Sequence, residues 1–299
     1  MKKNLSLLLI LFSIIFLGFL NAPKAKTTPK ENTTYLNIPE ELFKPIRIKD
    51  TFPEIKASVA SSILLNDNKK IILYEKNLEK ETPIASLTKL MTAVIVLDNY
   101  PLDSIILIDE DMLKAWGTSI NLRLGEHVTI KDLLNIMLLE SNNDASECLA
   151  AKLNRENFII LMNEKAKELK MKNTIFLNPS GLDEDNDTYN ISSAKDLTIL
   201  TAEIIKNYPE IVEILSKTEY DFVSESQLHY RIYNTNAMLK EFPYDAWGKT
   251  GYTLKANECL ILMTKTPQND TIINVIINSN DRFHEMRKLT TWINNSFSF

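Results

Sequence analysis

The sequence predicts a fold of mixed helices and strands, class α/β (α+β), on three observations. Strand-like runs at 57–65 and 70–74 come first, a helical middle follows, and strand candidates at 247–253, 259–264 and 271–278 precede a closing helix. The chain has 299 residues, of which 44% are hydrophobic and 24% charged. That is the composition of a globular protein with a substantial core.

The N-terminus predicts export from the cytoplasm. A basic start, Met1-Lys2-Lys3-Asn4, is followed by a mostly apolar run at 5–20. We therefore interpret residues 1–22 as a signal peptide or an N-terminal membrane anchor. The cleavage signals after the run are poor, which favours an uncleaved anchor with membrane attachment through 5–20. Residues 23–50 resemble a linker, and the folded region is expected at 51–299 on the extracytoplasmic side.

The first two strand-like runs predict a hairpin. They are joined by Asn66-Asp67-Asn68, residue types that favour turns. The hairpin leads to Ala85-Ser86-Leu87-Thr88-Lys89, where apolar residues at helical spacing begin and one helix face is expected to pack inward. Residues at i and i+3 share one side of a helix, so Ser86 and Lys89 can meet. A serine needs an adjacent base to become a nucleophile, and a lysine with a lowered pKa can be that base.

This serine–lysine spacing is not specific by itself. The chain contains a second instance, Ser192-Ser193-Ala194-Lys195. A capping serine beside a solvated lysine explains either one equally well. The rest of a catalytic site must therefore decide between them.

The helical middle offers the next candidates. Thr129 and Asp132 resemble a capping box ahead of an apolar stripe, and this helix is expected to end at Ser141-Asn142-Asn143. A second helix from Asp144 to about residue 153 would place Ser141 and Asn143 side by side in a cleft, although both residue types also serve as ordinary helix caps. Ser119-Ile120-Asn121 offers a similar pattern in an irregular stretch. Further helices are predicted at 158–169 and 194–204.

The last candidate is Trp247-Gly248-Lys249-Thr250-Gly251-Tyr252-Thr253, in a strand-like context. The chain has only six glycines, and two of them flank Lys249-Thr250. We interpret these glycines as allowing a substrate backbone to approach an exposed strand edge. A plain strand end would leave the Lys-Thr pair unexplained.

Composition excludes several other functions. The net charge of −5 provides no basic surface for nucleic acid. Three scattered histidines argue against a histidine triad or a zinc site, so we expect no metal and no cofactor. Cys148 and Cys259 lie in apolar surroundings and are expected to be buried free thiols.

Three motifs follow one another along the chain: Ser86-x-x-Lys89, Ser141-x-Asn143 and Lys249-Thr250-Gly251. Their order is that of the penicillin-recognising serine enzymes. The chain resembles the serine D-Ala-D-Ala carboxypeptidases (the low-molecular-weight penicillin-binding proteins, peptidase family S11) from about residue 55 to its C-terminus. The segments that carry this resemblance are 83–93, Leu122-Arg123-Leu124-Gly125-Glu126, 141–145, Asn178-Pro179-Ser180-Gly181-Leu182 and 249–253. The second serine–lysine pair lies after Ser141 and falls outside the order.

The resemblance implies a β-lactamase/transpeptidase-like fold: an antiparallel sheet flanked by helices, from about 51–85 and 240–299, and a mostly helical subdomain at 86–239. It also implies an activity, removal of the terminal D-alanine from peptidoglycan stem peptides through an acyl-serine, with β-lactams as inhibitors.

The resemblance also assigns roles to residues. Ser86 is the nucleophile and Lys89 its base, with Ser141 relaying a proton to the leaving amine. The backbone N–H groups of Ser86 and Tyr252, which follows Gly251, form the oxyanion hole. The expected substrate-binding side chains are Asn143, which holds the acyl amide, Lys249, which supplies positive potential, Thr250, which binds the terminal carboxylate, and Arg282 near that carboxylate. A solvated cation at the start of the last helix is the other interpretation of Arg282.

Two alternatives remain open. A β-lactamase of related fold needs a carboxylate to activate water, and the loop after Gly181 holds Asp183, Glu184 and Asp185 without the usual spacing. An inactive, wall-binding relative would not need the intact serine–lysine pairs.

Several positions depart from the family pattern. Asn142 and Asn257 stand where glycine is common, and the stretch 189–194 also differs from the family sequence. None of these changes removes a catalytic atom.

Overall fold

The computed structural model describes residues 45–66, 69–115, 122–184, 187–242 and 246–299. The predicted signal or anchor segment and most of the predicted linker lie outside these residues, as do Asp67-Asn68 of the first turn, Ser119-Ile120-Asn121 and Asp185. No helix in the described ranges has the length and apolarity to cross a bilayer.

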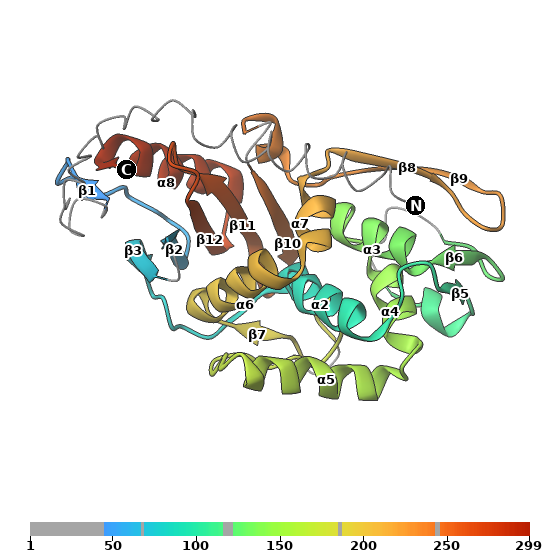
Figure 1. The fold of residues 1–299 in the computed structure, drawn as a ribbon. Coiled ribbons are helices and arrows are strands. Elements are labelled where there is room, and N and C mark those ends of the chain that lie inside the picture. The colour runs from blue at the N-terminus through green and yellow to red at the C-terminus, as the bar shows by residue number, and fades with distance from the viewer. Residues whose placement is uncertain (1–44, 67–68, 116–121, 185–186, 243–245) are drawn as a thin grey trace, which may run out of the picture. The chain divides into compact units, whose positions relative to one another are not determined.

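The strands and helices alternate along the chain much as the sequence predicts (Figure 1). The strands are β1 Ile46–Arg47, β2 Val59–Asn66, β3 Lys69–Lys76, β4 Thr82–Pro83, β5 Ile105–Leu107, β6 His127–Thr129, β7 Ile191–Ser192, β8 Glu219–Val223, β9 His229–Tyr233, β10 Trp247–Thr253, β11 Asn257–Lys265, β12 Thr271–Ser279 and β13 Phe297–Ser298. The helices are η2 Ala85–Thr88, α2 Lys89–Asn99, η3 Asp111–Leu113, α3 Ile130–Leu139, α4 Asn143–Ala151, α5 Arg155–Glu168, α6 Ala194–Asn207, α7 Pro209–Ser216, η4 Ala237–Lys240 and α8 Arg282–Ser296.

The central sheet has five strands in the order β10-β11-β12-β2-β3, and every neighbouring pair is antiparallel. This confirms the predicted antiparallel sheet and places β10, which carries Lys249 and Thr250, at one edge. Helix α8 packs against β11 and β12 on one face, whereas α6 packs against β12 and β2 on the other (Figure 1).

Burial on both faces explains why β11 and β12 have nearly continuous apolar sequences. Successive side chains of a strand point to opposite faces. Leu260 and Leu262 accordingly pack in the cluster beneath α8, while Cys259, Ile261 and Met263 belong to the cluster shared with the helical layer. Cys148 and Cys259 are both buried free thiols, as predicted.

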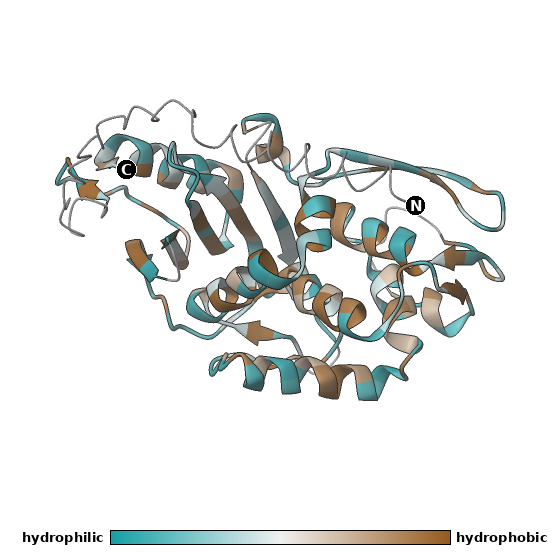
Figure 2. Ribbon diagram, in the orientation of Figure 1, coloured by the Kyte–Doolittle hydropathy of each residue, from teal (hydrophilic) through white to brown (hydrophobic). Residues whose placement is uncertain are grey.

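Helix α2 differs from the one-sided helix that the sequence predicts. Its residues from Lys89 to Val96 are all buried. The helix contacts α3, α4, α5, α6 and α7, so it has no solvent side along this length. The outer helix α5 is amphipathic instead: Phe158, Met162 and Ala166 form its buried stripe, and hydrophilic and hydrophobic segments alternate along it in Figure 2.

Several elements are absent from the sequence prediction. These are α7, the β8–β9 hairpin and the short two-stranded pairings. One pairing, between β1 and β13, brings Ile46–Arg47 of the predicted linker against the C-terminus. Two residues per strand leave no periodicity for a sequence pattern to reveal.

The cap of α3 is confirmed. The Thr129 hydroxyl accepts a hydrogen bond from the Asp132 N–H at 3.1 Å and donates one to Asp132 Oδ2 at 2.6 Å. The cap fixes the start of the helix whose far end leads to Ser141.

We therefore expect Thr129→Ala to lower the free energy of unfolding by about 1 kcal/mol, the usual cost of a lost N-cap. Urea unfolding measures this change. Thr291→Ala, on the exposed side of α8, is the control and should stay within about 0.5 kcal/mol of the wild type. Equal stability of Thr129→Ala and the wild type would show that the cap contributes nothing.

Candidate active site

Ser86 lies in the turn η2, immediately before the buried helix α2. The preceding Ala85 has φ of +47°, in the left-handed region that alanine avoids. The loop at 178–182 packs against this turn through Gly181, where φ is +83° and an added Cβ would lie 1.9 Å from the Ala85 carbonyl oxygen. Only glycine fits this contact, so the loop and the strained serine turn are held together by backbone packing.

Lys89 reaches back to Ser86 from the first turn of α2, and its side chain is completely buried. Its Nζ lies 3.0 Å from Ser86 Oγ, 2.7 Å from Asn143 Oδ1 and 2.6 Å from the Ser180 carbonyl oxygen. A neutral amine donates two hydrogen bonds and accepts one. The amide and carbonyl oxygens are acceptors, and the Ser86 hydroxyl can donate. The three contacts therefore suit an uncharged lysine that accepts the serine proton.

The surroundings favour the same uncharged state. Burial lowers the pKa of Lys89 well below its ordinary value, and the nearby positive charge of Lys249 lowers it further, whereas Glu147 acts in the opposite direction. The structure shows that desolvation is the larger cause.

A second buried lysine, Lys249, contacts the hydroxyl of Ser141. Lys249 Nζ lies 2.8 Å from Ser141 Oγ and 3.0 Å from the Thr250 carbonyl oxygen. Burial, followed by repulsion from Arg282, lowers the pKa of Lys249 to about 7. Ser141 has φ of +62°, and the next residue, Asn142, accepts a hydrogen bond from the Ala145 N–H as the N-cap of α4. Asn142, one of the departures from the family pattern, therefore has a structural role.

The glycines around Lys249 face other parts of the protein. A Cβ on Gly248 would lie 2.1 Å from the Ile261 carbonyl oxygen, and one on Gly251 would lie 3.1 Å from the Ser86 nitrogen. Gly251 thus lets β10 pack directly against the serine turn. The expected approach of a substrate backbone to the edge of β10 stays a prediction.

Thr250 has a partner that the sequence analysis misses. Its hydroxyl lies 2.6 Å from the hydroxyl of Thr235, whose N–H donates to the Leu139 carbonyl oxygen at 3.0 Å. The polar run Asn234-Thr235-Asn236 before β10 is the only sequence signal for this contact. Through it, the end of α3 fixes the orientation of the Thr250 side chain.

Arg282 contacts β10, and Tyr252 lies within this strand. Arg282 Nη1 donates to the Gly251 carbonyl oxygen at 2.8 Å, so this side chain contacts the strand and is not merely a solvated cation at the start of α8. The Tyr252 residue is 59% exposed at the sheet edge.

The structure separates the second serine–lysine pair from this cluster. Ser192 is buried, with its hydroxyl 2.7 Å from that of Thr174, and Ser193 caps α6. Lys195 extends along the surface to Glu79, 2.5 Å away. The capping interpretation holds for this pair, whereas Ser86 and Lys89 lie among the other predicted residues.

The lowered pKa of Lys249 has a consequence for stability. Between about pH 7 and 10.5 the unfolded chain binds a proton at Lys249 that the folded protein does not. The buried charge of Lys249 therefore destabilises the folded protein fully below about pH 7 and not at all above 10.5, the pKa of the unfolded chain. We therefore expect the free energy of unfolding to rise with pH across this window, and to rise less steeply in Lys249→Met. Urea unfolding at several pH values measures the slope.

The control for this slope is Lys265→Met, which removes an exposed lysine of β11 and should keep the wild-type slope. An unchanged slope in Lys249→Met would mean that Lys249 remains charged in the folded protein at neutral pH.

Comparisons with known proteins agree with this geometry. The family profile described as D-alanyl-D-alanine carboxypeptidase matches residues 47–281. The chain is 33% identical to D-alanyl-D-alanine carboxypeptidase DacF of Bacillus subtilis over 219 residues, which cover 71% of this chain and 55% of that protein. It is 35% identical to the D-alanyl-D-alanine endopeptidase of Escherichia coli over 254 residues, 81% of this chain and 78% of that one.

A solved structure shows the same fold. Penicillin-binding protein D2 of Listeria monocytogenes, in its cefotaxime-bound form, superposes with a TM-score of 0.70 and 29% identity, covering 82% of this chain and 99% of that one. The pairs Ser86–Lys89 and Ser141–Lys249, each with a buried lysine, thus occur in a chain that belongs to the D-alanyl-D-alanine carboxypeptidase family, the S11 serine peptidases.

Proposed function

We propose that this protein removes the terminal D-alanine from peptidoglycan stem peptides through an acyl-serine at Ser86. The observation that carries the proposal is the environment of Lys89. Its amine is buried and bonded to two acceptors and one hydroxyl, which is the state that a general base for Ser86 requires.

Acylation begins at the serine turn. Ser86 Oγ attacks the carbonyl carbon between the two D-alanines, and its proton passes to Lys89 Nζ. The backbone N–H groups of Ser86 and Tyr252 are proposed to stabilise the oxyanion. The close contact between Gly251 and the Ser86 nitrogen supports this, because it places β10 next to that N–H.

Departure of D-alanine needs a proton on its nitrogen. Ser141 is proposed to relay it as the C–N bond breaks, and the 2.8 Å contact with Lys249 Nζ orients its hydroxyl. Asn143 Oδ1 is bound to Lys89, so the proposed contact with the acyl amide uses its Nδ2 group. The terminal carboxylate is proposed to bind the Thr250 hydroxyl, in the positive potential of Lys249 and Arg282. Water then cleaves the ester and restores Ser86.

The carboxylates of the loop after Gly181 bear on the β-lactamase alternative. Asp183 Oδ2 accepts a hydrogen bond from the Lys255 N–H at 3.1 Å, and Glu184 is ion-paired with Arg155 at 2.7 Å. Both have structural partners, which supports a peptidase whose penicilloyl ester is long-lived. The family membership also favours a peptidase over an inactive wall-binding module.

A second candidate is endopeptidase action on cross-linked peptides. The relatives from Escherichia coli and Pseudomonas aeruginosa named D-alanyl-D-alanine endopeptidases are matched over 78% and 76% of their length, against 55% for DacF. Both reactions cut after the same D-alanyl carbonyl, so the proposed residues serve either one. Release of monomers from a cross-linked muropeptide dimer would identify the second activity.

The substrate also suggests where the protein acts. Peptidoglycan lies outside the cytoplasmic membrane, in agreement with the predicted export signal. Membrane attachment through residues 5–20 is part of the same proposal, and N-terminal sequencing of membrane fractions tests it.

We expect the purified protein to release D-alanine repeatedly from a D-Ala-D-Ala peptide, while labelled penicillin forms an adduct at Ser86 that persists for minutes. A tenfold slower deacylation needs only about 1.4 kcal/mol of extra barrier, so poorly placed water is enough to preserve the adduct. The measurements are D-alanine release and peptide mapping of the adduct.

Ser86→Ala should lose both reactions. Ser192→Ala, which removes the serine of the second pair, should keep both. Rapid penicillin turnover without D-alanine release would show that the protein is a β-lactamase, and an adduct on another serine would refute the assignment of Ser86.

A further inference from the structure

The third contact of Lys89 comes from a loop whose position must itself be fixed. The Ser180 carbonyl oxygen lies 2.6 Å from Lys89 Nζ. A few residues later Glu184 forms an ion pair with Arg155 Nη2 at 2.7 Å. This pair ties the loop to the start of α5.

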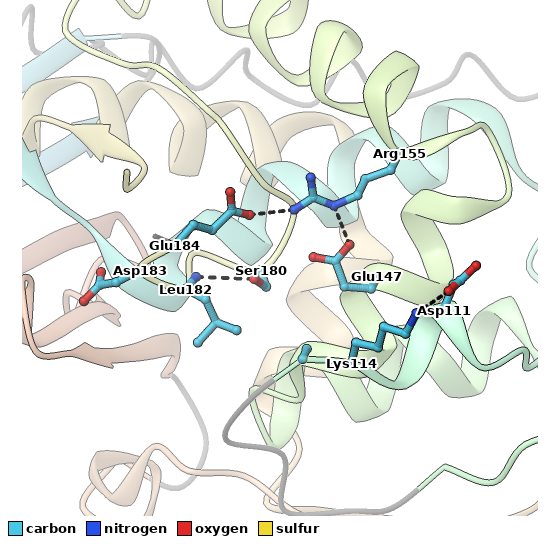
Figure 3. Close-up of a pocket in the computed structure, with 9 residues that line it drawn as sticks. Asp111, Lys114, Glu147, Arg155, Ser180, Leu182, Asp183 and Glu184 are labelled. Atoms are coloured by element: carbon cyan, nitrogen blue, oxygen red, sulfur yellow. Dashed lines mark hydrogen bonds and ion pairs between the residues drawn. The ribbon is translucent and has the colours of Figure 1, made fainter. Parts of the chain in front are cut away.

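Arg155 also holds α4. Its Nε lies 2.8 Å from Glu147 Oε2, so one guanidinium joins Glu147 and Glu184 (Figure 3). Arg155 is the first residue of α5, and Asn154 caps that helix by accepting from the Glu156 and Asn157 N–H groups. The base of the arginine side chain is therefore anchored, and its fork can hold two carboxylates from separate elements.

Glu147 is also linked to Lys89 electrostatically. It follows Asn143 by one turn of α4, and residues at i and i+4 share a helix face. Asn143 binds Lys89 Nζ directly, so the carboxylate lies on the side of α4 that faces the lysine. Glu147 opposes the lowering of the Lys89 pKa that burial and Lys249 produce. Its side chain is only 18% exposed, so water screens its charge incompletely.

Glu147, Arg155 and Glu184 line a cavity of about 540 Å³ together with other charged groups. Asp111 forms an ion pair with Lys114, and Asp183 accepts from the Lys255 N–H. Asp144, on α4, is not part of this lining, and its carboxylate accepts a hydrogen bond from the N–H of the lining residue Ala115 at 3.0 Å. Each of these groups has a structural partner, and the ion pair of Glu147 is with Arg155.

We propose that Arg155 is a positioning residue for the acylation step. Its guanidinium ties the loop that presents the Ser180 carbonyl to α4, and it offsets the negative charge of Glu147 beside Lys89. This inference rests on the proposed function, because it concerns the base that activates Ser86.

The test is the pH profile of acylation by labelled penicillin in the full-length protein. The rate falls at acid pH as Lys89 becomes protonated. In Arg155→Gln the uncovered Glu147 charge favours protonated Lys89, so the acid limb should move to higher pH by roughly 0.3 to 1 unit. In Glu147→Gln the carboxylate is gone, and the limb should move to lower pH.

The double variant separates charge from packing. Arg155→Gln with Glu147→Gln no longer carries the Glu147 carboxylate, which is the acidic group that raises the pKa of Lys89, so its limb should not move to higher pH. Arg155→Lys keeps the charge and should restore most of the wild-type midpoint. Arg231→Gln is the matched control, because it breaks a surface ion pair with Asp221 in the β8–β9 hairpin at 2.8 Å and should leave the profile unchanged.

Three results would overturn the proposal: an Arg155→Gln midpoint equal to that of the wild type, a Glu147→Gln midpoint that does not fall, or an Arg155→Lys midpoint displaced as far as that of Arg155→Gln. If Arg155→Gln fails to fold, Glu147→Gln still decides. Absence of acylation in the wild type would contradict the proposed function, whereas normal wild-type acylation with an unmoved midpoint in the variants would contradict this inference alone.

Discussion

The buried amine of Lys89 is the constraint on which the site depends. A lysine without contact with water is costly while charged, and the cost is removed when it loses its proton. Burial therefore makes Lys89 a base that is neutral in the pH range where an exposed lysine is charged. The apolar packing of α2 is what excludes water from Lys89, so the core and the proposed chemistry are not separable in this protein.

The geometry around the amine is held by backbone as much as by side chains. The serine turn has an alanine in the left-handed region, and it is confined between Gly181 on one side and Gly251 on the other. Strain of this kind persists only when the surrounding structure enforces it. The central sheet enforces it here, because β10 is paired with β11 along its whole length and cannot move away from the turn.

Much of this arrangement could be predicted from the sequence. The alternation of strands and helices, the cap at Thr129 and the order of the three motifs identify the fold and bring Ser86, Lys89, Ser141, Asn143 and Lys249 into one site. These features are local patterns, or spacings that a resemblance can supply. The complete burial of α2 was not predictable, since periodicity along one helix does not reveal how many neighbours it has.

Other features depend on contacts between distant segments. From the sequence, Gly248 and Gly251 are interpreted as allowing a substrate backbone to approach. In the structure, a Cβ on Gly248 would meet Ile261, and one on Gly251 would meet the serine turn. Thr235 orients Thr250 from fifteen residues away, and Arg155 joins two elements separated by 37 positions, from Glu147 to Glu184. Such pairs carry no spacing signal, because the folded chain alone brings them together.

The most direct test of the account is the protonation state of Lys89 in the resting protein. Lysines labelled with ¹³C and ¹⁵N report their charge by NMR, and the Lys89 signal is the one missing from Lys89→Arg. The account predicts a neutral amine at neutral pH that becomes charged only as the pH falls. A Lys89 signal that remains charged from neutral pH up to the range of exposed lysines, while Ser86 is still acylated, would contradict it.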